Sequence, residues 1–110
     1  MKFAIPLAEG KLTAHFGHCQ EFALIETDNG EIKEKEILIP PQHEPGVLPR
    51  WLHEKGADVI IAGGMGQKAQ QLFADNDIAV VIGAPAEAPE TLVKNYLNDT
   101  LVGGENICDH

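Results

Sequence analysis

The fold is decided by an apolar run and the glycine loop that follows it, Asp58-Val59-Ile60-Ile61-Ala62 and Gly63-Gly64-Met65-Gly66. The run is short, rich in β-branched residues and lies between two helical patterns, which is typical of a buried parallel strand. The glycine loop leads directly into a helix that we predict over residues 67–75. A strand, a loop and a helix in this order indicate a βα unit of an α/β fold.

Further helices and a further strand surround this unit. A helix is predicted over residues 47–55, where Pro49 suits the first turn and Gly56 suits the left-handed position after the last turn. Residues 78–82 form a second buried strand pattern, and residues 89–98 carry the apolar stripe of a third helix. The second half of the chain therefore alternates between helix and strand.

The N-terminal part instead predicts an antiparallel meander. Alternating residues predict strands over Lys2–Leu7, Glu21–Thr27 and Glu31–Ile39, and Asn29-Gly30 predicts a type I′ turn between the last two. The segment Ala8–Gln20 is predicted to be a loop. The element order is therefore β-β-β-α-β-α-β-α, which predicts an α/β protein with a mixed sheet covered by helices.

Composition narrows the class of protein. The 110 residues fit one domain, expected over residues 1–104, with a flexible C-terminal tail over 105–110. The net charge of −9 disfavours nucleic acid and anionic membrane surfaces as partners. There is no apolar run long enough for a transmembrane helix and no evident signal peptide, so we expect a cytoplasmic protein with two free thiols.

The densest group of metal-ligand side chains is His15-Phe16-Gly17-His18-Cys19, in the predicted loop. Imidazole and thiolate suit zinc, copper and iron–sulfur species. Gly17 allows a bend through which His15 and either His18 or Cys19 could converge on one ligand. The alternative is that His15 caps the loop, His18 is solvated and Cys19 is a small buried hydrophobe.

Two smaller groups carry similar chemistry. The chain closes on Cys108-Asp109-His110, which could fold over a bound metal species or could simply be disordered. His43 lies in a loop before the first helix, where the alternative is an ordinary exposed histidine. With His15 and Cys19, these residues make metal or metal-cluster binding the first hypothesis.

The glycine loop is the candidate for binding an anion. It follows a strand at its carboxyl end, where α/β sheets bind ligands, and glycines let backbone N–H groups approach a negative charge. The alternative is a tight turn that needs positive φ. Met65 is either a local plug or a soft contact to a ligand. No nucleotide-binding fingerprint, catalytic triad or two-metal carboxylate set is visible, so we predict that the chain is not an enzyme.

Several of these segments together resemble a known family. They are the opening strand Met1–Leu7, the loop His15-Phe16-Gly17, the run from Gly56 to Gly66 and the terminal Cys108-Asp109-His110. They are similar to the dinitrogenase iron-molybdenum cofactor biosynthesis family, which includes NifX-type carriers, the C-terminal part of NifB proteins and the molybdenum–copper orange protein. The resemblance covers essentially the whole chain. It implies a ribonuclease H-like α/β fold and non-catalytic binding or carriage of a metal–sulfur cluster, or its precursor, that contains Mo with Fe or Cu.

The resemblance and the residue patterns give two sets of candidate site residues. The candidates for contact with the cluster are His15, Phe16, Gly17, His43, Gly63, Gly64, Met65 and Gly66. The candidate metal ligands are His15, Cys19, His43, Cys108 and His110. The expected partners are the cluster or its precursor and a cluster-donor, cluster-acceptor or ATPase protein. The alternative function is a regulatory or interaction module that binds a partner protein or a small anion through the same cleft.

Overall fold

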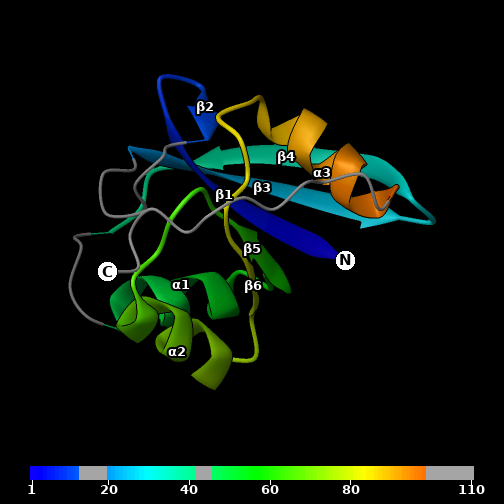
Figure 1. The fold of residues 1–110 in the computed structure, drawn as a ribbon. Helices are drawn as coiled ribbons and strands as arrows, with labels where there is room; N and C mark the ends of the chain where they lie inside the picture. Colours follow the sequence, from blue (N-terminus) through cyan, green and yellow to red (C-terminus); the bar gives the residue numbers. More distant parts are fainter. Residues whose placement is uncertain (13–19, 42–45, 99–110) are drawn as a thin grey trace.

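The computed structural model describes residues 1–12, 20–41 and 46–98. These residues form one mixed sheet with helices on both faces (Figure 1). The strands are β1 (Lys2–Ala8), β2 (Lys11–Leu12), β3 (Glu21–Asp28), β4 (Glu31–Leu38), β5 (Val59–Ile61) and β6 (Ala79–Val81). The helices are α1 (Val47–Glu54), α2 (Gln67–Asp75) and α3 (Pro89–Leu97).

The strand order across the sheet is β4-β3-β1-β5-β6, and β2 pairs with β1. Strands β1, β3 and β4 are antiparallel neighbours, whereas β1, β5 and β6 run parallel to one another. The predicted mixed sheet is thus confirmed. The predicted hairpin turn is confirmed too, because Asn29 and Gly30 have φ of 52° and 79°, as a type I′ turn requires.

The predicted order of elements was wrong in one respect, because the segment predicted as loop contains strand β2. Ala8 extends β1, and Glu9 and Gly10 then reverse the chain with φ of 56° and 82°. This turn lets Leu12 pair with Leu7 and become buried. A two-residue strand is too short to leave a periodic pattern in the sequence, which explains the error.

The helices begin where the sequence predicts them. Helix α2 has the predicted bounds, and α1 and α3 each end one residue earlier than predicted. Gly56 follows α1 with φ of 86°, as expected of a left-handed residue after a helix. The longest helices of the described part have nine residues, and none is long and apolar enough to cross a membrane.

The sheet separates two hydrophobic cores. Helices α1 and α2 cover one face, and α3 covers the other (Figure 1). The core under α1 and α2 consists of Ala4, Phe22, Leu24, Leu48, Leu52, Ala57, Ile60, Ala62, Met65, Phe73 and Ile78. The core under α3 consists of Phe3, Ile5, Leu7, Leu12, Ala23, Ile25, Val59, Ile61, Ala84, Leu92 and Val93. Both cores bury alternate residues of the same strands, so the sheet is fixed in register from both sides.

Candidate functional site

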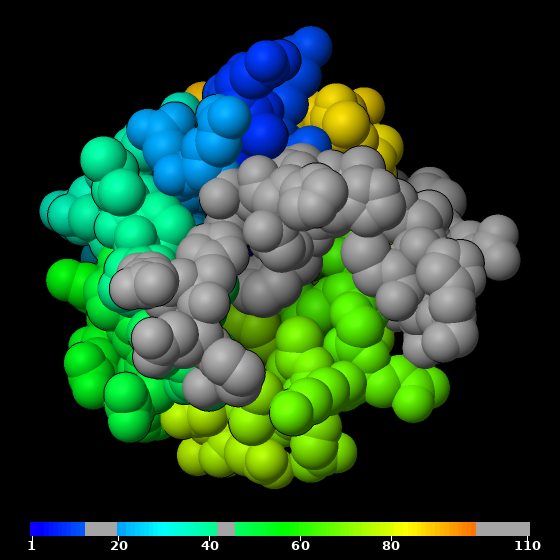
Figure 2. All heavy atoms as spheres, turned by 90° about the vertical axis from the view of Figure 1, so that its left-hand side faces the viewer, coloured from blue at the N-terminus to red at the C-terminus, as the bar shows by residue number. Residues whose placement is uncertain are grey.

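The carboxyl ends of the parallel strands β1, β5 and β6 meet at one edge of the molecule. Ala4 of β1 pairs with Ile60 of β5, and further along β1 Leu7 pairs with Leu12 of β2 instead. Figure 2 looks onto this edge, with the turn between β1 and β2 (blue) at the top and residues of α2 (yellow-green) at the bottom. The glycine loop therefore lies at the same edge of the sheet as the end of β1, although the two are more than fifty residues apart in the sequence.

Both ends of the predicted histidine loop are held at this same point. On one side of residues 13–19, Leu12 pairs with Leu7 and its N–H donates to the carbonyl of Glu87 at 3.1 Å. On the other side, the N–H of Gln20 donates to the Leu7 carbonyl at 2.7 Å. The predicted site residues His15, Phe16, Gly17 and Cys19, and their neighbour His18, lie outside the described residues, but the points where their loop begins and ends are fixed.

The glycine loop follows β5 and bends at Gly63. Its Gly63 carbonyl accepts a hydrogen bond from Gly83 at 2.9 Å, just beyond the bond from Ala62 N–H to the Val81 carbonyl at 2.8 Å. None of Gly63, Gly64 and Gly66 has positive φ, and Gly66 has φ of −66°. The interpretation as a turn that needs positive φ is therefore wrong, and the small size of these residues has another reason.

Met65 anchors this loop to the core. Its side chain is fully buried under α1 and α2, while its carbonyl accepts a hydrogen bond of 2.8 Å from the Gln70 side-chain amide. Of the two roles predicted for Met65, the structure thus shows the first, in which the side chain fills a space in the core and the thioether lies away from the surface. Gln70 was not identified from the sequence, where the signal would have been a polar residue one helical turn after a glycine loop.

The N-termini of α1 and α2 point to this edge as well (Figure 1). Their N-cap residues are Gly46 and Gly66, neither of which offers a side-chain cap, and neither helix has an acidic residue in its first turn. By contrast, α3 carries Glu90 in its first turn. The partial positive charge at the start of α1 and α2 is therefore not neutralised by their own side chains, which suits an anion.

Metal ligands are not brought together by the described residues themselves. Residues 1–12, 20–41 and 46–98 contain no group of three or more His, Cys, Asp or Glu side chains that could hold a metal ion. Among the histidines only His53 falls within these ranges, and it is exposed in the last turn of α1. The predicted ligands His43, Cys108 and His110 lie outside the described residues.

A small mixed α/β protein, with a glycine loop and two helix N-termini that lack acidic caps at one edge of its sheet, is thus the class that fold and site define. The chain belongs to the dinitrogenase iron-molybdenum cofactor family, whose sequence model matches residues 1–99. The family resemblance predicted from the sequence is confirmed. It supports binding related to a metal–sulfur cofactor in general.

Individual relatives agree with this assignment. The chain is 37% identical over 78 residues to an uncharacterized protein of Methanocaldococcus jannaschii, MJ0580, and the match spans 66% of each of the two chains. Among solved structures, PH0822 is similar with a TM-score of 0.85 and 26% identity, over 93% of each chain. The apo form of the orange protein from Desulfovibrio gigas shares the fold, with a TM-score of 0.74 and 20% identity over 96% of this chain and 93% of that one.

Proposed function

We propose that this protein binds or carries, without catalysing a reaction, a metal–sulfur cluster or cluster precursor that contains Mo with Fe or Cu. The site would be the carboxyl edge of the sheet. The observation that carries the proposal is that Leu12 and Gln20, which flank residues 13–19, both contact Leu7 at the carboxyl edge of the sheet, the edge to which the glycine loop also belongs. Because both flanking residues contact Leu7, we place the proposed site at this end of β1.

Two kinds of group would share the work of binding. His15, His43 and Cys19 would supply the soft nitrogen and sulfur ligands that thiomolybdate, copper and iron species prefer, with Cys108 and His110 added from the C-terminal segment. Backbone N–H groups of the glycine loop and of the starts of α1 and α2 would face the negative charge of the sulfur-rich cargo. Met65 would contribute through its backbone, since its side chain is in the core.

The negative net charge of the chain requires local positive charge at a site that binds an anion. A chain of net charge −9 repels a thiometallate anion at long range, so a local positive field must offset the repulsion. The exposed Arg50 on α1 and Lys68 on α2 add to the two helix N-termini. The same amides would also serve the alternative function, a module that binds a small anion or a partner protein, so the test must separate metal ligation from anion binding.

The first experiment tests the ligands. Purified protein is reconstituted with tetrathiomolybdate and either Cu or Fe, and metal stoichiometry and visible absorption are measured. His15→Ala combined with His43→Ala should abolish metal retention, whereas His53→Ala, an exposed histidine of α1, should retain it. If wild type retains no metal, or if the double variant retains as much as wild type, the proposal is wrong.

The second experiment tests the glycine loop with an isosteric pair, Gly66→Asn and Gly66→Asp. A Cβ added at Gly66 meets no atom within 4 Å, and φ of −66° with ψ of 157° suits an N-cap side chain. A carboxylate one helix turn (about 5.4 Å) from a unit negative charge costs about 1–3 kcal/mol at an effective dielectric of 80 to 20. Gly66→Asp should therefore bind tetrathiomolybdate about 5- to 150-fold more weakly than Gly66→Asn. Equal affinities would exclude this edge as the anion site.

A further inference from the structure

The two edges of the sheet differ sharply in charge. The edge strand β4 carries five charged residues, namely Glu31, Lys33, Glu34, Lys35 and Glu36. The other edge strand, β6, belongs to the uncharged run from Ile78 to Ile82. Charged side chains on an edge strand prevent pairing with another chain, so β4 is protected in a way that β6 is not.

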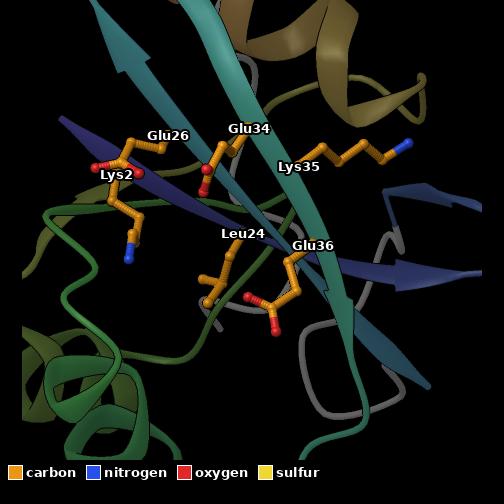
Figure 3. A pocket seen from close by; sticks show the side chains of 6 residues that line it. All are labelled: Lys2, Leu24, Glu26, Glu34, Lys35 and Glu36. Carbon is orange, nitrogen blue, oxygen red and sulfur yellow. The ribbon is translucent and has the colours of Figure 1, made fainter.

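The charge pattern of β4 disfavours its pairing with a second β4 in the register centred on Lys35. Two copies related by a two-fold axis pair antiparallel, and each residue then faces one whose side chain lies on the same side of the sheet. Glu34 and Glu36 project to one side and Lys35 to the other (Figure 3). The register centred on Lys35 therefore places Glu34 opposite Glu36 and Lys35 opposite its own copy, which is destabilising.

Strand β6 has its outer backbone groups free for pairing within the described part of the sheet. Ala79 donates to the Asp58 carbonyl at 3.0 Å, and the Val81 carbonyl accepts from Ala62 at 2.8 Å. Ala79 and Val81 thus direct their backbone groups at β5. Because these groups alternate along a strand, the N–H and C=O of Val80 point away from the sheet.

A groove without charged side chains runs along this edge. It has a volume of about 490 Å³ and lies between α2 and β6. Its lining consists of Gln67, Gln70, Gln71, Ala74, Ile78, Ala79 and Val80. In a chain with 17 acidic and 8 basic residues, such a surface is one place where a second copy can approach without meeting like charge.

We propose that two copies of this chain associate through β6, paired antiparallel about a two-fold axis at Val80. The pairing places Ile78 opposite Ile82, apolar against apolar, and extends the sheet continuously through both copies. Helix α2 of each copy then lies on the same face of the joined sheet, and Gln71 and Ala74 line the groove beside the paired strands. Because the strands are antiparallel, the two carboxyl edges face opposite ways and both candidate sites stay open. This inference is independent of the proposed cluster binding.

The test measures mass in solution for the full chain by sedimentation at about 0.15 M salt, over a concentration series reaching about 1 mM. The weight-average mass should rise from 11.9 kDa toward twice that value. Ala74→Glu adds a like charge across the axis at an exposed groove position and should weaken association about tenfold or more. Thr91→Glu, exposed on α3 at the other face, should leave it unchanged.

A backbone variant gives a second, independent arm. Val80→Pro removes the outward N–H without touching the hydrogen bonds to β5, which proline on an edge strand permits. This variant should fold, as shown by circular dichroism, and remain monomeric across the series. A wild-type chain that is monomeric at the highest concentration overturns the proposal, as does dimerisation that Ala74→Glu leaves unchanged.

Discussion

Replacing Met65 separates its role as a core plug from a role as a ligand. The Met65 side chain is fully buried and belongs to the core that includes Phe22, Leu52 and Phe73. Truncating a fully buried methionine to alanine costs about 2–5 kcal/mol. Domains of this length have a total stability of about 5–16 kcal/mol, so Met65→Ala should fold but with a large loss.

Trp51 provides the signal for this measurement. It is the single tryptophan of the chain and packs edge-on against Phe22, with ring centroids 5.9 Å apart, next to the core that holds Met65. Urea unfolding followed by its fluorescence should show a midpoint lower by about 1–3 M for Met65→Ala. The volume-conserving Met65→Leu should cost less than about 1.5 kcal/mol.

The same pair of variants decides whether the thioether touches the cargo. Met65→Leu should retain as much metal as wild type, because the loop stays anchored while the sulfur is lost. A cost of less than about 1 kcal/mol for Met65→Ala would refute the core role. Loss of metal from a stable Met65→Leu protein would show that the sulfur leaves the core to bind.

Three further predictions concern the scaffold. Gly30→Ala should cost about 1–2 kcal/mol in urea unfolding, because φ of 79° is unfavourable for a residue with a Cβ; an unchanged midpoint would contradict the type I′ turn. The Lys35 ammonium, 3.0 Å from Glu90 Oε1, lowers the pKa of that carboxyl. The Lys35–Glu90 ion pair therefore stabilises the fold above the unfolded-state pKa of Glu90, which is about 4.3. This stabilisation is lost as the pH falls through the lower pKa that Glu90 has in the folded state. Lys35→Met should lower the free energy of unfolding by less than about 1 kcal/mol at pH 7, since both side chains are more than a third exposed. It should have no effect at about pH 2 to 3. A larger loss of stability in acid than at pH 7 would contradict the stabilising role of this ion pair. Glu34→Lys should stabilise by about 0.2–1 kcal/mol, because Glu34 lies directly opposite Glu26; a loss of stability would show that this pair is not repulsive.

Most of the fold could be predicted from the sequence because several local sequence patterns indicated the same elements. The Asn29-Gly30 turn and the glycine after α1 each require backbone geometry that few other residues allow, and both lie where predicted. The alternation of Ile37 and Ile39 predicted a strand but not its position at the edge, where Ile37 is 43% and Ile39 80% exposed. Edge or centre is decided by which strands pair, and pairing is a long-range property.

The site was harder to predict because it is made by tertiary contacts. The glycine loop was recognised from its composition, but the reason for its glycines was not, since none has positive φ. The meeting of the end of β1 and the glycine loop at one edge depends on the pairing of β1 with β5, two segments far apart in the sequence. The hydrogen bond from Gln70 to the Met65 carbonyl likewise depends on how the loop meets α2, although a polar residue one helical turn after the glycine loop was visible in the sequence.

The metal content of the protein purified without oxygen tests cluster binding most directly. Wild type should contain molybdenum together with iron or copper and should be coloured, whereas the variant with His15→Ala and His43→Ala should be colourless and His53→Ala should match wild type. A colourless wild-type protein that contains no molybdenum, iron or copper, and that acquires none on reconstitution with tetrathiomolybdate and either metal, would contradict the proposed function.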